Sequence, residues 1–398
     1  MFSLTREILM QDLRQAYKDA CLHKKCKHYI VRFNRNLDER LNQLCDDLWE
    51  RRYQALPSSC FIVTYPKKRE VFAAEFRDRI VHHLYYNYTA ELFCRTFIQD
   101  TYSCIPGRGT HYGIDRLEKQ IRSCSHGYTL PCYVLQMDIS GYFMHIDRQR
   151  LLQIATESLR QMSHHRILSR VPVRWCDRLD FDFLEYLTRE IILLDPTENC
   201  RLVGNPVDWN DLPYGKSLFQ MPPGRGLPIG NLTSQLYSNV YMNVFDQWMK
   251  RSLKVEHYGR YVDDFFVVSR DRDYLHRIIP LAEEFLSEKL GLSIQQGKTT
   301  ITSVYDGISF LGAFLKPHGV RYIDNKSLHN MQVKLAELRR SQSCEASNNH
   351  ICSALNSYLG VLVHYRSFNI RNQLMKSHAG FTDKGVFTLD LTKFRPFE

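Results

Sequence analysis

Two adjacent carboxylates lie inside a run that otherwise favours β-structure, the stretch GRYVDDFFVVS at residues 259–269. The aromatic and β-branched residues around Asp263 and Asp264 predict two strands joined by a tight turn, with both acids at its tip. Neighbouring anions repel each other, and burial adds a desolvation cost. Bound cations would balance that charge, and oxygen ligands on a rigid turn suit Mg²⁺, which substrate phosphates usually complete. The alternative is a solvated turn that uses Asp only for its backbone conformation.

A third acid, Asp138, ends the apolar run YVLQMD at residues 133–138. If one sheet brings this carboxylate beside Asp263, the pair could hold two metal ions about 3.5–4 Å apart, as in enzymes that transfer phosphoryl groups in line. The alternative for Asp138 is an N-cap for the helix that follows it.

The rest of the chain predicts a mixture of helices and short strands. Residues 5–56 show helical spacing, with Asn36 as the N-cap of one helix. The stretch CFIVTYPKKREVFAAEF predicts a β-hairpin with a basic tip. Further helices are expected at about 77–93, 114–123, 147–161, 236–248 and 274–290, strands at about 299–304 and 307–315, and helices again from residue 324 to the tail FTLDLTKFRPFE.

Composition narrows the class of partner. The chain has 53 Lys and Arg against 43 Asp and Glu, and 12% of its 398 residues are aromatic. This combination suits a polyanion whose bases can stack, such as a nucleic acid. The 12 cysteines form no CxxC pair, which favours reduced thiols in a cytosolic protein. The first fifteen residues carry charges, which argues against a signal peptide. The sequence has no apolar run long enough to predict a membrane span.

Five blocks of the sequence occur in the order and spacing of the palm motifs of reverse transcriptases, so the chain resembles that class. The blocks are QMDISGYF, GLPIGNLTSQLYSNVYMN, YVDD, LSIQQGKT and SFLGAFL. Within the class, GLPIGNLTSQ, PKKREVFAAEFRDRIVHHL and SYLGVLVHYRSFNIR are most similar to the enzymes of diversity-generating retroelements.

The resemblance implies an α+β, right-hand polymerase fold with fingers, a palm built on an antiparallel sheet, and a helical thumb. It divides the chain into an N-terminal helical extension of the fingers (1–60), the fingers (61–130), a palm with part of the fingers and an insertion at about 163–225 (131–315), and the thumb with a C-terminal tail (316–398).

The resemblance also implies roles for particular residues. Asp138, Asp263 and the backbone carbonyl of Ile139 would hold two Mg²⁺ ions, with Mn²⁺ as a possible substitute, and Asp264 would contribute more weakly. Lys298 would lie near the pyrophosphate leaving group as a general acid.

Phe143 would exclude a 2′-hydroxyl from the nucleotide site, its alternative being a core residue. Ile229 stands where many reverse transcriptases carry Gln, and since Ile cannot hydrogen-bond we relate it to errors opposite template adenine. The other expected nucleotide contacts are Lys67, Arg69, Arg77, Ile139, Gly230 and Gln235. The expected primer or template contacts are Arg79, Asn231 and a turn formed by Phe310, Leu311 and Gly312, whose alternative is a buried strand. For the basic residues, the alternatives are a solvated turn at Lys67 to Arg69 and ion pairs of Arg77 or Arg79 with Asp78 or Glu75.

The function implied is RNA-directed DNA synthesis from a template-repeat RNA, error-prone at adenines, for targeted gene diversification by mutagenic retrohoming. The implied partners are template RNA, the RNA/cDNA hybrid, dNTPs and a small basic accessory protein that forms a ring, in the cytoplasm of a bacterium or encoded by a phage, without a membrane. The alternatives are a group II intron, retron or defence-type reverse transcriptase, and a catalytically inactive RNA-binding scaffold.

Overall fold

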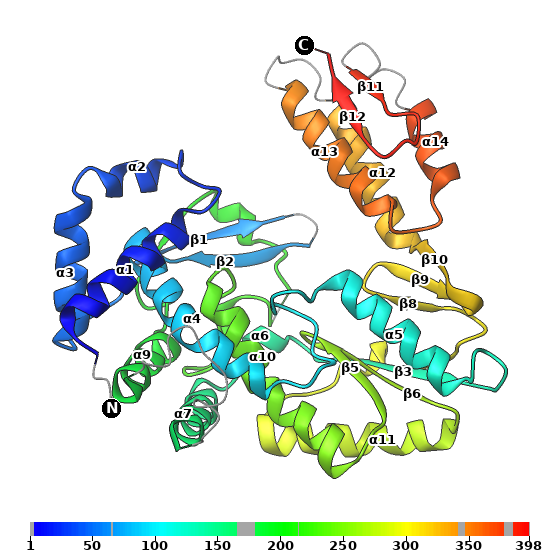
Figure 1. Ribbon diagram of the computed structural model, residues 1–398, viewed down its shortest axis with the longest axis horizontal. Helices are drawn as coiled ribbons and strands as arrows, with labels where there is room; N and C mark the ends of the chain where they lie inside the picture. Colours follow the sequence, from blue (N-terminus) through cyan, green and yellow to red (C-terminus); the bar gives the residue numbers. More distant parts are fainter. Residues whose placement is uncertain are drawn as a thin grey trace. The chain divides into compact units, whose positions relative to one another are not determined.

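The computed structural model describes residues 4–64, 67–164, 180–213, 215–340, 347–377 and 385–397, and it mixes helices with short sheets, as expected of an α+β fold (Figure 1). The chain divides into two compact units. The first comprises Met1–Gly109, Met137–Phe265 and Arg277–Thr299, and the second comprises Thr110–Gln136, Phe266–His276 and Thr300–Glu398. Both units are therefore assembled from segments that are distant in sequence.

Helices make up most of the first unit. They are α1 (Arg6–Cys21), α2 (His28–Asn34), α3 (Leu37–Trp49), α4 (Phe76–Thr96), α6 (Tyr142–His145), α7 (Arg148–His164), α9 (Phe181–Leu193) and α10 (Leu232–Gln247), the last continuing as a π-helical turn over Trp248–Ser252. The predicted apolar stripe of α3 is buried at Leu41, Leu44 and Leu48. Asn36 does stand at the N-cap of α3, but its side chain bonds Glu39 at 2.9 Å and caps no backbone N–H.

The predicted β-hairpin is present in the first unit. Strands β1 (Ser58–Val63) and β2 (Arg69–Ala73) pair antiparallel, with Cys60 opposite Phe72. Residues 65 and 66 of the predicted turn lie outside the described residues. A third strand, β4 (Cys200–Leu202), pairs parallel to β1 and comes from the segment that the sequence marked as an insertion. That segment is thus part of the β1–β2 sheet, which local sequence patterns do not reveal.

A four-stranded sheet carries the acidic residues. Its order is β5 (His257–Tyr261), β6 (Asp264–Ser269), β3 (Tyr133–Asp138) and β7 (Thr300–Ser303). Because β6 and β3 are neighbours, the turn between β5 and β6 lies next to the end of β3. Phe265 and Phe266, which follow the paired acids, are almost fully buried. The apolar residues of the opening sequence motif therefore anchor β6 in the core.

Helix α11 (Arg272–Phe285) follows β6 and continues as a π-helical turn over Leu286–Leu290. Its bounds match the helix expected at residues 274–290.

The second unit contains α5 (Thr110–Cys124), a meander of β8 (Ile308–Phe310), β9 (Ala313–Lys316) and β10 (Val320–Ile323), the helices α12 (Asn325–Arg340), α13 (Ser347–Leu362) and α14 (Phe368–Ser377), and a hairpin of β11 (Gly385–Phe387) and β12 (Phe394–Pro396). The sequence pattern predicted one strand over residues 307–315, which was wrong, whereas the resemblance implied a turn at Phe310, Leu311 and Gly312, where the chain does turn. Leu311 and Gly312 both have positive φ, at 50° and 84°, which reverses the chain in the manner of a type I′ turn.

No helix in the described part of the chain is both long enough and apolar enough to cross a membrane.

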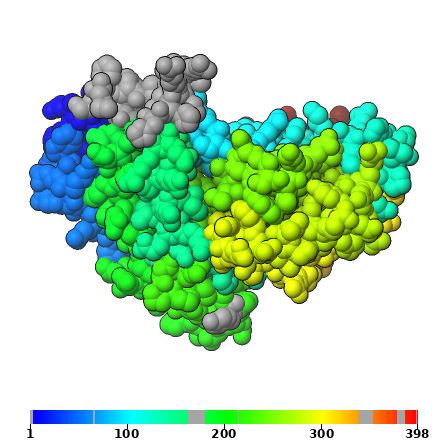
Figure 2. Space-filling view, turned by 90° about the horizontal axis from the view of Figure 1, so that it is seen from below, coloured from blue at the N-terminus to red at the C-terminus, as the bar shows by residue number. Residues whose placement is uncertain are grey.

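Helices α7 and α9 pack against each other, and their residues line an open groove of about 1090 Å³. Helix α7 contributes to the green surface shown in Figure 2. The groove includes none of the three acids of the sequence motifs.

Candidate active site

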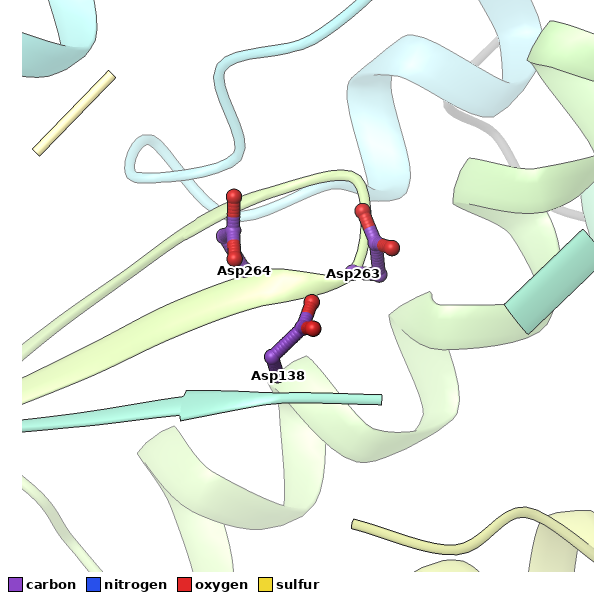
Figure 3. A group of neighbouring side chains, drawn as sticks. All are labelled: Asp138, Asp263 and Asp264. Carbon is purple, nitrogen blue, oxygen red and sulfur yellow. The ribbon is translucent and has the colours of Figure 1, made fainter. Parts of the chain in front are cut away.

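Asp138, Asp263 and Asp264 converge on one point (Figure 3). One carboxylate oxygen from each lies within 4.8 Å of the other two. Asp138 is the last residue of β3, Asp263 belongs to the two-residue turn before β6, and Asp264 is the first residue of β6. Among the described residues no other trio of acidic, His or Cys side chains meets this way.

The three carboxyl groups are crowded, and they range from buried to exposed. Asp138 is buried, with 6% of its surface exposed, whereas Asp264 is the most exposed of the three. Burial, and then repulsion from Asp138, raises the pKa of Asp263. Loss of hydration, followed by repulsion from Asp263 and Asp138, raises the pKa of Asp264 to about 7. The site therefore favours a bound cation that would offset this repulsion.

Lys298 supplies one such positive charge. Its Nζ donates a hydrogen bond to Asp138 Oδ2. Burial alone would lower the pKa of the Lys298 ammonium, but the bond to Asp138 and the charges of Asp264 and Asp263 raise it. The backbone fixes this pairing, because Gln295 N donates to Asp138 O at 2.7 Å and Lys298 follows in the next turn.

The donor set fits a hard divalent cation. Carboxylate oxygens are the ligands that Mg²⁺ and Mn²⁺ take in proteins, and three of them meet here on strand ends and a short turn. The carbonyl of Ile139 belongs to the same segment, because this buried residue directly follows Asp138.

Phe143 lies just beyond the acids on the short helix α6. Its ring is partly buried and meets the Tyr142 ring edge to face at 5.4 Å, while its carbonyl accepts a bond from Leu227 N at 2.8 Å. Tyr142 is buried and donates to Ser238 O at 2.5 Å. Gly141 makes the turn into α6 with φ of 54°, and a Cβ there would lie 2.7 Å from the His145 ring.

The GLPIGN segment is tied to the β1–β2 hairpin. Ile229 O accepts a bond from Phe72 N at 2.8 Å, and the Ile229 side chain packs against Cys60, Phe72, Met144 and Leu218. Gly230 has φ of 126°, and a Cβ there would lie 2.6 Å from Phe72 O. Only glycine therefore fits this approach of the two backbones.

The next predicted contacts lie on α10. Asn231 is buried at the N-cap of this helix, although its side chain makes no capping bond. Gln235 is exposed one turn later, where it lines a pocket of about 200 Å³ together with Tyr86 and Arg108.

The hairpin arginine and lysines differ in their surroundings. Arg69 is exposed on β2, and its charge lowers the pKa of Asp263 slightly against the larger effects that raise it. Lys67 is exposed, whereas Lys68 donates to Asn210 O. Of this group, the structure brings Arg69 within electrostatic reach of the acids.

Arg77 and Arg79 both make contacts within the protein. Arg77 bonds Asp47 Oδ2 at 2.9 Å and Gln54 O at 3.2 Å, and Arg79 bonds Ala74 O at 2.7 Å and lies 4.7 Å from the Tyr29 ring centre. Arg77 thus pairs with Asp47, which the sequence did not suggest as a partner. Its expected alternative, Asp78, accepts bonds from Tyr53 and Leu56 N instead.

Phe310, Leu311 and Gly312 form the turn of the β8–β9 hairpin in the second unit. Phe310 is buried against Phe266, with ring centres 5.2 Å apart. Gly312 O accepts a bond from Asp324 N at 3.0 Å.

Sequence reasoning missed a buried polar cluster behind the acids. Arg260 and Asp246 are both fully buried and form an ion pair. Asp246 is the only charged residue of α10, and that was the signal available in the sequence.

A family model, a curated protein and several solved structures are similar to this chain. A model of the family described as reverse transcriptase (RNA-dependent DNA polymerase) matches residues 67–315, a range that includes the three acids and Lys298. Protein YkfC of Escherichia coli (strain K12) is 25% identical over a match that covers 71% of this chain and 72% of that protein.

Among solved structures, apo telomerase from Candida tropicalis is 12% identical with a TM-score of 0.48, over 81% of this chain and 61% of that one. Telomerase from Candida albicans in complex with the TWJ fragment of telomeric RNA is 12% identical with a TM-score of 0.46, over 86% and 59%. The chain thus spans about three fifths of the telomerase chains that it matches.

Proposed function

The chain belongs to the reverse transcriptase family of RNA-dependent DNA polymerases, and we propose that Asp138, Asp263 and Asp264 form the metal centre with which it copies RNA into DNA. The observation that carries this proposal is the approach of three carboxylate oxygens to within 4.8 Å, inside the range that the family model matches. The raised pKa values of Asp263 and Asp264 support it, since they reflect burial first and then repulsion between the carboxylates, which a bound cation would relieve.

Asp138 and Asp263 would be the main ligands of two Mg²⁺ ions, for which Mn²⁺ can substitute, and Asp264 and the Ile139 carbonyl would contribute further oxygens. Bound divalent ions supply charge stabilisation to the attacking and leaving oxygens of a phosphoryl transfer. The protein contributes rigidity, because a strand end and a short turn hold the carboxylates in place.

Lys298 would balance charge at the leaving-group side of the site. Its raised pKa keeps the ammonium protonated while Asp138 holds it. To act as the general acid, it would have to leave Asp138, and its pKa would then fall. Arg69 and Lys67 would bind the triphosphate, with Arg offering the planar fork that matches phosphate oxygens.

The nucleotide would lie against Phe143, Gly230 and Gln235. The ring of Phe143 would exclude a 2′-hydroxyl, and Gly230 allows the α10 N-terminus to approach β2 closely. Arg77 would act here indirectly, because its guanidinium pairs with Asp47.

Template RNA and the RNA/cDNA hybrid would be held by Arg79, Asn231 and the hairpin turn at Phe310, Leu311 and Gly312. Such contacts position a duplex through its phosphates and sugars and do not read its sequence.

Primer extension tests the proposal. With a DNA primer on an RNA template and Mg²⁺, the wild-type chain should incorporate dNTPs, and Asp263→Asn should lower the rate about 10³-fold, because metal stabilisation is worth several kcal/mol and each 1.36 kcal/mol is tenfold. Asp306→Asn, an exposed acid in the turn after β7, is the matched control and should retain activity. A folded wild-type chain that binds RNA but incorporates nothing with either Mg²⁺ or Mn²⁺ would favour the inactive scaffold.

At a finer level, we propose that the enzyme serves a diversity-generating retroelement, copying a template-repeat RNA with errors at adenines and acting with a small basic ring-forming protein. The sequence GLPIGNLTSQ supports this proposal, because Ile229 stands at the position where many reverse transcriptases carry Gln.

The fidelity hypothesis is tested by the adenine misincorporation rate of Ile229→Gln. We expect this rate to fall, since Gln can hydrogen-bond to the template nucleotide whereas Ile cannot. Ile229 also packs against the buried cluster that contains Phe72 and Leu218. The thermal stability of the Ile229→Gln variant must therefore be measured together with its error rate. An error rate equal to that of the wild type would count against this role.

A further inference from the structure

The turn that carries Asp263 has an unusual backbone. Val262, its first central residue, has a φ of 58°, whereas the φ of Asp263, the second, is not positive. A positive φ at the first central residue alone is the pattern of a type II′ turn. That position normally belongs to glycine, and a β-branched side chain there is strained. Something in the surrounding structure must hold Val262 in this conformation.

Both backbone polar groups of Val262 are held from the protein interior. Its carbonyl accepts a bond from Arg260 Nη1 at 2.8 Å, and its N–H donates to Ser103 Oγ at 3.2 Å. Ser103 is buried and linked to Asn239 of α10, whose Nδ2 donates to Ser103 O at 2.8 Å. The turn is thus gripped on both sides of the strained residue.

Arg260 is itself fixed by a fully buried acid. Its Nε and Nη2 donate to the two carboxylate oxygens of Asp246 at 2.8 and 2.6 Å, and neither side chain is exposed. Asp246 also accepts bonds from Tyr258 at 2.6 Å and from Thr101 at 2.9 Å. The carboxylate is therefore saturated, and Arg260 has a single orientation available.

A buried ion pair is weak evidence for stability, because apolar residues of similar volume often serve as well. What apolar residues cannot do is donate a bond to the carbonyl of Val262 while tied to α10, as Arg260 of β5 does through Asp246. We propose that the pair Arg260–Asp246 is a positioning device that holds Val262 in its left-handed conformation and so fixes the Asp263 carboxylate for metal binding. This inference rests on the proposed function of the three acids.

Mn²⁺ binding tests this positioning role without relying on activity. It is measured as the loss of the free-ion signal in electron paramagnetic resonance. Arg260→Lys keeps the charge but loses the planar fork, and we expect Mn²⁺ affinity to fall about 10- to 100-fold, as for other residues that orient metal ligands. In primer extension the same variant should raise the Mg²⁺ concentration needed for half-maximal rate more than it lowers the rate at saturating Mg²⁺.

A second substitution separates positioning from general stability. Glycine adopts a positive φ without strain, so Val262→Gly placed in the Arg260→Lys background should restore part of the lost Mn²⁺ affinity. The matched control is Thr188→Val, which removes a buried hydrogen bond to Tyr85 in the same unit but touches no part of the turn. It should lower thermal stability and leave Mn²⁺ affinity unchanged.

The proposal is overturned if folded Arg260→Lys binds Mn²⁺ as the wild type does, or if Val262→Gly worsens the defect. Should Arg260→Lys fail to fold by circular dichroism, Ser103→Ala removes the bond from Val262 N and the bond to Asn239 Oδ1 while leaving the Arg260–Asp246 pair in place, and wild-type affinity in that variant would contradict the premise that Val262 must be held for metal binding. Failure of the proposed function would give a different result. In that case the wild-type chain would show no Mn²⁺ binding that is lost in Asp263→Asn.

Discussion

At the scale of single residues, the three acids show how closely charge and burial are balanced in this protein. Asp264 has a pKa of about 7 because hydration is lost and two other carboxylates lie near it. Asp138, in contrast, has Lys298 as a direct partner. Asp264 and Asp138 therefore differ in their surroundings although their carboxylates converge on one point.

Asp78 illustrates a buried acid with a structural role. It is 1% exposed, and its carboxylate accepts bonds from Tyr53 at 3.0 Å and from Leu56 N at 2.9 Å. Burial nevertheless raises its pKa from 3.8 to about 6. Because the folded state binds this proton more tightly than the unfolded state, the stabilising contribution is fully present below pH 3.8 and is lost as pH rises through 6.

This predicts a pH-dependent effect of Asp78→Asn. From pH 5 to pH 8 the wild-type chain should lose about 1.4 kcal/mol of stability through this group, and the variant should not. The variant should therefore compare more favourably with the wild type at pH 8 than at pH 5. Urea unfolding at both pH values measures the difference, with Asp306→Asn as an exposed control, and a pH-independent difference would contradict the pKa shift.

At the scale of elements, the hairpin β1–β2 depends on a segment far along the chain. Glu70 of β2 is fully buried and accepts bonds from Trp209 Nε1 at 3.0 Å, Ser217 Oγ at 2.9 Å and Leu218 N at 2.6 Å. Strand β4 extends the same sheet. Arg69 precedes Glu70, so the bonds that fix Glu70 also fix the strand that presents Arg69.

Replacing Glu70 by Gln should loosen this connection. The amide keeps the shape of the side chain but cannot accept all three bonds, and we expect the free energy of unfolding to fall by about 1–3 kcal/mol. The segment around Trp209 should become more sensitive to limited proteolysis, and the KM for dNTPs should rise. Glu198→Gln, an exposed change in the same segment, is the control. Unchanged stability and proteolysis would show that the three bonds do not hold the segment.

At the scale of the whole molecule, the site is gathered from remote parts of the chain. Asp138, Asp263 and Lys298 come from three separate stretches, and all belong to the first unit. That unit also contains Ile229, whose backbone bonds to Phe72 of the β1–β2 hairpin. The candidate active site therefore depends on contacts between segments that are distant in sequence, and these contacts form only when the unit as a whole is folded.

Local patterns in the sequence were sufficient for a large part of the fold. Alternation and β-branched content predicted the β1–β2 hairpin and the strands around Asp263, and helical spacing predicted α3 and α11, because these signals depend on neighbours along the chain. The five ordered blocks were enough to name the acids and Lys298 as one group.

Only the tertiary structure decided the partners of buried polar groups. The sequence predicted one strand where Leu311 and Gly312 turn back, and it gave no sign that β4 joins β1 or that Arg77 pairs with Asp47. Nor could it show that Arg260 reaches Asp246 and the carbonyl of Val262. A period of two or 3.6 residues tells which face of an element is buried, but the partner of a buried charge is set by how distant elements pack, and that information is not local.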